Sequence, residues 1–135
     1  MSEKQETTFT RKLVKLLPLS MYIEKTNNPY RRGTPDLYLE DLDFSMWVEM
    51  KWIEKPWGER FISREQICKS KSWPLQLRWL QRAAANGHRT AVIVGVGSKE
   101  AYIIGYPFDY ENHRLMPLDD IIYTILTWEK NNEQL

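Results

Sequence analysis

The chain has 135 residues, 42% of them hydrophobic, and its 19 Lys and Arg against 18 Asp and Glu give a net charge of +1. This size fits one domain around one core, and the near-neutral balance excludes a polycation that binds nucleic acid over its whole surface. The only cysteine, Cys68, excludes an internal disulfide and a multi-cysteine zinc site. We therefore expect a single domain over residues 1–135 in a reducing compartment.

The first residues, MSEKQETT, lack the apolar centre of a signal peptide, and nowhere do about 18 apolar residues run together. These features predict a soluble, cytoplasmic protein with no membrane partner. The short chain and the lack of a targeting signal also fit a phage or bacterial origin.

The first predicted element is a helix over about Glu3 to Leu17, which Ser2 can cap and Pro18 closes. Its apolar residues follow helical spacing: Phe9, Leu13 and Leu16. The stretch MYIEK (21–25) then predicts a short strand. NNPYRRGTP, which follows, is rich in turn-forming residues and predicts a loop.

LYLEDLDFSMWVEMKW (37–52) predicts two strands joined by the six-residue turn EDLDFS. A long segment of mixed charge and aromatic residues follows as far as Ser72, and its length indicates a functional loop. Pro74 suits the first turn of a helix that runs to about Asn86. Gly87 stands just beyond it, where a left-handed cap is favoured.

TAVIVGVG (90–97) predicts a buried strand, and EAYIIGY (100–106) is its hairpin partner across GSK. The last predicted helix covers about Asp119 to Lys130, with its isoleucines on one side. The order is therefore α-β-β-β-α-β-β-α. Such an order favours an α/β fold in which helices flank a mixed sheet.

Charged residues stand where this sheet should be apolar. Side chains alternate along a strand, so one face of MWVEMKW carries Trp47, Glu49 and Lys51. If Leu39 pairs with Met46, the same register sets Asp36 opposite Glu49. Like charges so placed destabilise a sheet, so we expect a positive charge between them.

Two interpretations supply that charge. Lys51 alone can form a cross-strand salt bridge on a solvated face, which is common and contributes little stability. The stronger interpretation is a divalent cation, because Mg²⁺ binds oxygen ligands, often one or two carboxylates together with substrate phosphates. Lys51 is then available to orient or deprotonate the attacking water, or to offset charge on a phosphate.

Pro35-Asp36 followed by Glu49-Met50-Lys51 resembles the signature of the PD-(D/E)xK nuclease superfamily. The stretches RRGTPD and PLQLRWLQRAAANGHRTAVIVG are similar to the small virus-type replication-repair nuclease group, VRR-NUC. The resemblance implies a restriction-endonuclease-like fold. It also implies that Asp36 and Glu49 hold Mg²⁺ or Mn²⁺ with the Met50 carbonyl, and that Lys51 is catalytic.

The resemblance also implies an acidic residue from the first helix and a glutamine from the helix after the catalytic strand. Glu6 is our candidate for the first, with Glu3 as its competitor, although an acidic residue in a first turn is also favoured by the helix dipole. Gln76 matches the second and would hydrogen-bond water or phosphate. The alternative for Gln76 is a solvated helix residue.

Cations that can pair with phosphates and aromatic rings that can stack on unpaired bases surround these motifs. The candidates for nucleic-acid contact are Arg31, Arg32, Trp57, Arg60, Phe61, Arg64, Lys69, Lys71, Trp73 and Arg78. The alternative is a solvated loop whose tryptophans cap the core. Three acidic residues that dilute the charge favour it: Glu54, Glu59 and Glu65.

Together these features predict a metal-dependent nuclease that hydrolyses phosphodiester bonds, with DNA favoured over RNA. The family makes branched or flapped DNA an attractive substrate and a homodimer the expected form. The alternatives are a non-catalytic nucleic-acid-binding or assembly module on the same fold, and a site-specific endonuclease of the restriction or homing type.

Overall fold

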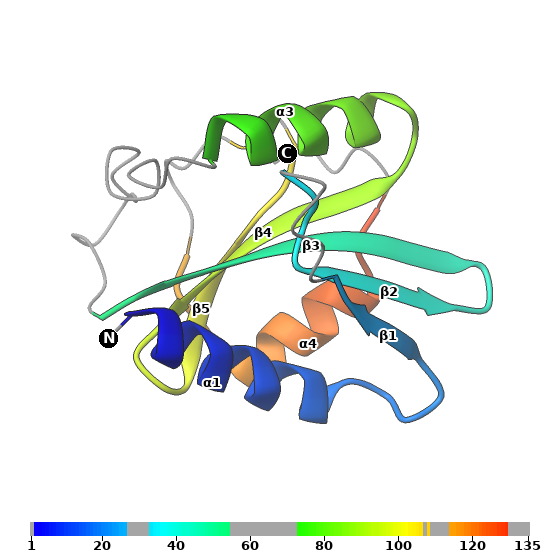
Figure 1. Ribbon diagram of the computed structural model, residues 1–135. Coiled ribbons are helices and arrows are strands. Elements are labelled where there is room, and N and C mark those ends of the chain that lie inside the picture. The colour runs from blue at the N-terminus through cyan, green and yellow to red at the C-terminus, as the bar shows by residue number, and fades with distance from the viewer. Residues whose placement is uncertain (1, 27–32, 55–72, 107, 109–113, 130–135) are drawn as a thin grey trace.

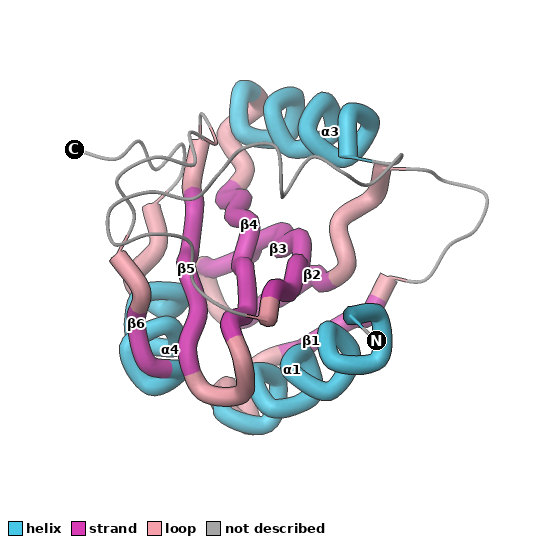
Figure 2. Tube along the Cα trace, turned by 90° about the vertical axis from the view of Figure 1, so that its left-hand side faces the viewer, coloured by secondary structure: helices cyan, strands magenta, loops and turns pink. Residues whose placement is uncertain are grey.

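The computed structural model describes residues 2–26, 33–54, 73–106, 108 and 114–129. In these residues six strands form one sheet in the order β1-β2-β3-β4-β5-β6, with helices on both faces (Figures 1 and 2). The elements are α1 (Ser2–Leu16), β1 (Tyr22–Lys25), β2 (Leu37–Asp41), β3 (Phe44–Ile53), α3 (Trp73–Ala85), β4 (Arg89–Val96), β5 (Glu100–Ile104), β6 (Met116–Pro117) and α4 (Leu118–Leu126). The predicted mixed sheet flanked by helices is confirmed.

Two apolar clusters lie on opposite faces of the sheet. α1 and α4 cover one face, and α3 covers the other (Figure 1). Ala91 and Ile93 of β4 belong to the α1 and α4 side, whereas Val92 and Val94 belong to the α3 side. Strand β4 is therefore buried on both faces, which explains why its sequence is apolar without alternation.

Strand β3 is the central element for the candidate site. It pairs antiparallel with β2 and parallel with β4, and the parallel connection requires a crossover, in which α3 lies. The crossover brings the beginning of α3 back over the second half of β3. The alternation of β3 is as predicted: Val48 and Met50 pack in the cluster under α1, while Trp47 contacts Trp79 of α3 with ring centroids 4.8 Å apart.

The β2–β3 turn is shorter than predicted. Glu40 pairs with Ser45 and Asp41 with Phe44, so only Leu42 and Asp43 form the turn. Asp43 has φ of 52°, a left-handed value that aspartate adopts in turns more readily than most residues. The predicted Leu39–Met46 register is nevertheless confirmed, because shortening both sides of a turn equally leaves the pairing unchanged.

The chain after α4 differs from the prediction. The helix ends at Leu126 rather than near Lys130, and Thr127 is its C-cap. Trp128 then turns back to the sheet, where its indole N–H donates to the Thr90 carbonyl at 2.9 Å. The two-residue strand β6 was not predicted, because two residues carry no readable period. No helix in the part of the chain that the structure describes is long and apolar enough to cross a membrane.

Helix α1 lies very close to β4. A Cβ atom added at Gly95 would come within 2.8 Å of the Phe9 ring. Only a glycine permits this approach, so Phe9 is buried against the strand. This contact fixes the position of the first turns of α1, which carry Gln5 and Glu6.

Candidate active site

Asp36 lies directly before β2, where the ladder with β3 ends at the Leu37–Val48 pair. Continuing the register by one residue sets Asp36 opposite Glu49, as predicted. The Met50 N–H donates to Asp36 Oδ2 at 2.9 Å. The side chain of Asp36 is therefore held against β3 beside Glu49.

Glu49 is a buried acid, with only 1% of its surface exposed. Its Oε2 lies 3.5 Å from the Lys51 ammonium. Its Oε1 accepts no hydrogen bond from any residue that the structure describes. A buried carboxylate oxygen without a partner destabilises the fold, so a salt bridge on a solvated face does not describe this arrangement.

The electrostatics of both acids follow from this burial. Burial raises the pKa of Glu49 well above its ordinary value of 4.5, the charge of Asp36 raises it further, and Lys51 opposes the increase. Burial also raises the pKa of Asp36 above 3.8, while the hydrogen bond from the Met50 N–H and the charge of Lys51 act to lower it. The positive charge of Lys51 therefore offsets only part of the effect of burial on the two acids.

Lys51 is held by α3. Its Nζ donates to Gln76 Oε1 at 2.8 Å and lies 5.3 Å from the centroid of the Trp73 ring. Gln76 is thus a half-buried partner of Lys51 and not a fully solvated helix residue. We expected Trp73 to be available for stacking on bases, but the structure buries it to 2% exposure in the core under α3, where it contacts Lys51.

Glu6 of α1 reaches the same region. It lines a cavity of about 390 Å³ together with Asp36, and its charge also raises the pKa of Glu49. The side chain of the competitor, Glu3, lies outside the described residues. Among the described side chains, no group of three or more His, Cys, Asp or Glu is arranged to hold a metal ion. Glu6 therefore lies near the acid pair without joining it directly.

Lys25 and Thr26 line the same cavity, and our sequence analysis did not single them out. The Thr26 N–H donates to the Asp36 carbonyl at 2.9 Å, and its hydroxyl donates to the Pro35 carbonyl. Lys25 is the last residue of β1 and pairs with Leu37, the residue after Asp36. The position of Lys25 and Thr26 directly before the predicted loop is the signal that could have identified them.

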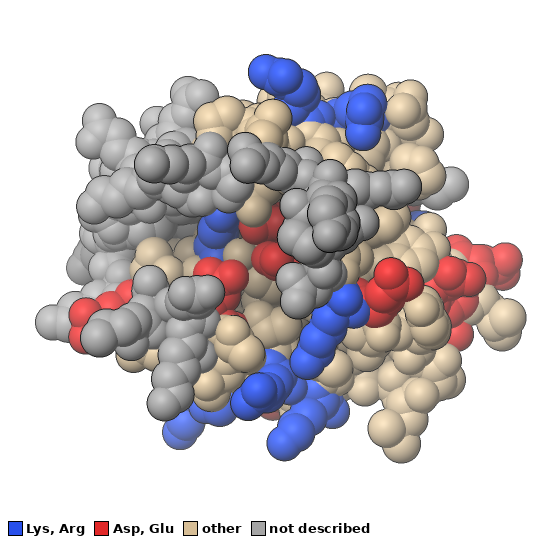
Figure 3. Space-filling model, viewed as in Figure 1, with Lys and Arg blue, Asp and Glu red and all other residues tan. Residues whose placement is uncertain are grey.

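The residues present fit a divalent cation. Asp36 and Glu49 offer carboxylate oxygens, the type of ligand that Mg²⁺ prefers, and Glu49 Oε1 has no other described partner. The N–H and C=O of one residue point to the same side of a strand, so the Met50 carbonyl points, like its N–H, toward Asp36. In Figure 3 acidic side chains line a hollow near the middle of the face, with a basic side chain beside them.

The loop that carries Asp36 packs against α3. Gly33 has φ of 88°, and a Cβ atom there would lie 2.8 Å from the Leu75 carbonyl oxygen. Glycine is required both by the positive φ and by the lack of space. This contact joins the loop that carries Asp36 to the turn of α3 that carries Gln76.

Most of the predicted nucleic-acid contacts lie outside the part of the chain that the structure describes. The residues that lie outside the described part of the chain are Arg31, Arg32, Trp57, Arg60, Phe61, Arg64, Lys69 and Lys71. Arg78 is described and is exposed on α3. Its role in binding stays a prediction.

No family model and no curated protein matches this sequence. Among solved structures, the fold is similar to that of Hjc, a Holliday junction resolvase from the hyperthermophile Archaeoglobus fulgidus. The two chains share 12% sequence identity with a TM-score of 0.51, and the match covers 92% of this chain and 94% of the other. The mixed six-stranded sheet and its helices are therefore a restriction-endonuclease-like fold.

Proposed function

We propose that this protein is a divalent-metal-dependent nuclease that hydrolyses phosphodiester bonds of DNA. The observation that carries the proposal is the pair of half-buried Asp36 and buried Glu49, in which Glu49 Oε1 has no described hydrogen-bond partner. Lys51 stands 3.5 Å from the second oxygen of Glu49. An unpaired buried carboxylate oxygen lowers the stability of the fold, and strongly perturbed acids in a cleft are typical of functional sites.

Asp36, Glu49 and the Met50 carbonyl would hold Mg²⁺ or Mn²⁺. A bound cation supplies the Lewis acidity that stabilises negative charge on the reacting phosphate. The Met50 N–H keeps Asp36 in place for this role. Glu6 lies near enough to bind through an intervening water.

Lys51 is the proposed catalytic lysine. Gln76 fixes its Nζ beside Glu49, so the ammonium is positioned before substrate binds. There it offsets the charge that grows on the phosphate as water attacks in line with the leaving oxygen. Gln76 acts through Lys51 as a positioning residue.

The finer proposal is selectivity for branched, flapped or four-way DNA. The fold is similar to that of a Holliday junction resolvase, and the RRGTPD and Gln76-helix stretches support assignment to the VRR-NUC group. A homodimer is the form that would place two sites on two strands.

The test is cleavage of labelled single-stranded, duplex, flap and four-way DNA with Mg²⁺ or Mn²⁺. We expect the wild type to cut branched DNA preferentially, and Asp36→Ala, Glu49→Ala and Lys51→Ala to fold but lose activity by about 100-fold or more. Lys15→Ala, an exposed lysine at the other end of α1, is the control and should keep full activity.

The outcomes separate the alternatives. Binding without cutting by the wild type would refute the enzyme and support the non-catalytic module. Cutting at one duplex sequence would support a site-specific endonuclease instead. Full activity in any of the three site variants would refute the assignment of that residue.

A further inference from the structure

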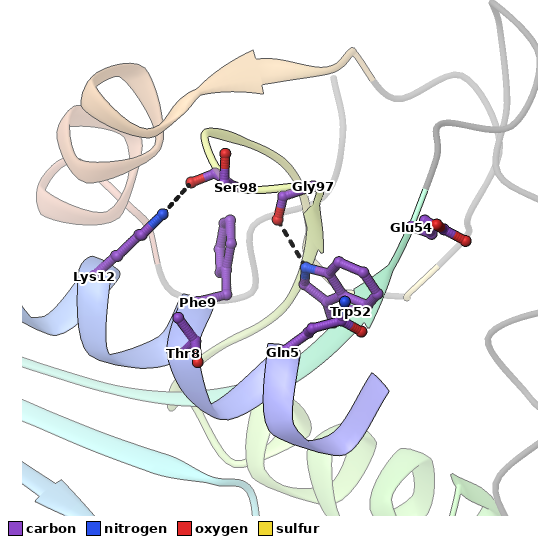
Figure 4. A pocket seen from close by; sticks show the side chains of 8 residues that line it. All are labelled: Gln5, Thr8, Phe9, Lys12, Trp52, Glu54, Gly97 and Ser98. Atoms are coloured by element: carbon purple, nitrogen blue, oxygen red, sulfur yellow. Dashed lines mark hydrogen bonds between the residues drawn. The ribbon is translucent and has the colours of Figure 1, made fainter. Parts of the chain in front are cut away.

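A second pocket lies on the other side of α1. It has a volume of about 600 Å³ and is enclosed by α1, the end of β3 and the β4–β5 turn (Figure 4). Gln5, Phe9 and Lys12 of α1 line it, whereas Glu6 and Thr10 of the same helix line the cavity at Asp36. At 100° per residue the mean directions of these two sets differ by about 110°, so the sets lie on different sides of the helix. The first turns of α1 therefore form a wall between the two pockets.

Trp52 provides a fixed aromatic wall in this pocket. Its indole N–H donates to the Gly97 carbonyl at 2.8 Å, as Figure 4 shows. This bond uses the only polar atom of the side chain, so the indole presents apolar aromatic surface to a ligand. Because the ring is already held in place, stacking on it would cost little side-chain entropy.

Among the described residues that line the pocket, the charged groups balance each other. Lys12 supplies one positive charge and Glu54 one negative charge, and the Lys12 ammonium already donates to the Ser98 carbonyl at 3.3 Å (Figure 4). A bare anion gains little from such a lining. Gln5 adds an amide that can both donate and accept hydrogen bonds. The chemistry suits a neutral, planar ring with polar edges.

The position of the pocket relates it to the candidate active site. Trp52 directly follows Lys51 in β3, and Gln5 directly precedes Glu6 in α1. The Lys51 and Trp52 side chains lie on opposite faces of β3, so a polynucleotide with a phosphate at Asp36 and Glu49 would pass the first turns of α1 to reach Trp52. Successive unpaired bases commonly stack on aromatic side chains beside a backbone-binding groove.

We propose that this pocket binds an unpaired nucleobase of the substrate strand, stacked on Trp52 and hydrogen-bonded at its edge by Gln5. The inference rests on the proposed function, because it takes the strand to be the one whose backbone lies at the acid pair. It assigns Trp52 and Gln5 to the recognition of single-stranded arms rather than to hydrolysis.

The test compares two fluorescein-labelled DNA forks by anisotropy in EDTA. The unpaired arm of one fork is thymidylate, and the arm of the other has the same length but consists of abasic residues. We expect the wild type to bind the thymidylate fork at least about fivefold more tightly, the lower end of the contribution of one base–aromatic stack. Trp52→Leu should abolish the difference, whereas Trp52→Phe should keep most of it.

Matched variants protect the test against misfolding, since Trp52 also packs against the core. Gln5→Ala changes an exposed residue and should reduce the preference for bases while leaving thermal unfolding unchanged. Lys15→Ala, on α1 but outside the pocket, should leave both affinities unchanged.

Equal affinity of the wild type for the two forks would overturn the inference. The inference would also be overturned if Gln5→Ala and a folded Trp52→Leu both kept the full preference for the thymidylate fork. Because no divalent cation is present, these outcomes are independent of hydrolysis. If the protein cuts DNA but binds both forks equally, the proposed function stands and the pocket assignment is wrong. If it prefers the thymidylate fork but never cuts DNA, the pocket assignment stands and the proposed function is wrong.

Discussion

At the scale of single residues, the site contains a local instability. Glu49 is almost fully buried, and its nearest charged neighbours are one ammonium and one further acid. Both acids have raised pKa values, so the folded chain holds protons that the unfolded chain releases. A cation in the same position would remove this cost, because it supplies the missing positive charge.

Replacing Glu49 should therefore stabilise the metal-free protein. The pKa of Glu49 is raised in the folded state, so the stability linked to its proton is fully present below about 4.5 and is lost as the pH rises through the folded pKa. Glu49→Gln carries no such charge. In EDTA its Tm should exceed that of the wild type by an amount that grows from pH 4.5 to pH 8, by about 4 °C for each kcal/mol.

The control for this prediction is Asp43→Asn, which changes an exposed acid in the β2–β3 turn. Its Tm difference from the wild type at each pH is the baseline against which Glu49→Gln is compared. A Tm difference for Glu49→Gln that stays constant across the range, or that shrinks as the pH rises, would show that Glu49 is not strained by its charge. Thermal unfolding followed by circular dichroism measures both.

The sequence was sufficient for the central residues of the site. Period-2 alternation set Glu49 and Lys51 on one face, and the predicted Leu39–Met46 pairing brought Asp36 to them although the turn is shorter than predicted. The contact between Lys51 and Gln76 needs the crossover from β3 to α3, which no local pattern encodes. Lys25 and Thr26 were missed because their proximity to Asp36 depends on strand pairing.

At the scale of elements, the loop before β2 and helix α3 form one unit. Gly33 touches the backbone of Leu75, which is the neighbour of Gln76. A displacement of this contact would move Asp36 and Gln76 relative to each other. The relative position of the loop and the helix thus sets how Asp36 lies relative to Gln76, the hydrogen-bond partner of Lys51.

Gly33→Ala should disturb both stability and activity. The added methyl group meets a backbone carbonyl at 2.8 Å and an unfavourable φ of 88°, and we expect a cost of about 2 kcal/mol or more. Gly87→Ala is the control, because Gly87 has φ of 87° but no atom within 4 Å of an added Cβ. It should cost only about 1 kcal/mol, the price of backbone strain.

The comparison of Gly33→Ala with Gly87→Ala separates the steric effect of the contact with Leu75 from the strain of a positive φ. Urea unfolding gives the two stabilities, and initial rates of DNA cleavage give the two activities. Activity should fall in folded Gly33→Ala and stay unchanged in Gly87→Ala. Equal effects of both substitutions would show that the contact with Leu75 does not position the site.

Element boundaries were less predictable than element types. Helix α1 begins at Ser2 and ends at Leu16, each one residue earlier than predicted, and α3 is likewise shifted by one. The larger error at α4 has a tertiary cause: Trp128 is buried and bonded to Thr90. The gain from packing this tryptophan ends the helix before its sequence pattern does.

At the scale of the whole molecule, the sheet order places the site at the centre. The parallel β3–β4 pair buries β3 between two neighbours, and α1 and α3 reach it from opposite faces. A net charge of +1 gives no general attraction for DNA. A cation bound at the acid pair would reduce the repulsion between these carboxylates and the phosphate of a bound strand.

Divalent cations should raise the stability of the whole fold. If Mg²⁺ or Mn²⁺ binds the native acid pair and not the unfolded chain, a concentration ten times Kd stabilises the fold by about 1.4 kcal/mol. The Tm of the wild type should rise with cation concentration at constant ionic strength. Asp36→Asn should show little of this increase, and an equal increase in the variant would indicate binding elsewhere.

The sequence by itself determined the type and order of nearly all the elements, the register of the β2–β3 hairpin and the acidic pair with its lysine. These depend on periods and turns within about 20 residues, which local physics encodes. Only the tertiary structure decided that Gln76 and Trp73 hold Lys51, that Gly33 fits against Leu75, and that α1 separates two pockets. Those contacts join segments far apart in the chain, and their positions are set by how helices pack on a twisted sheet.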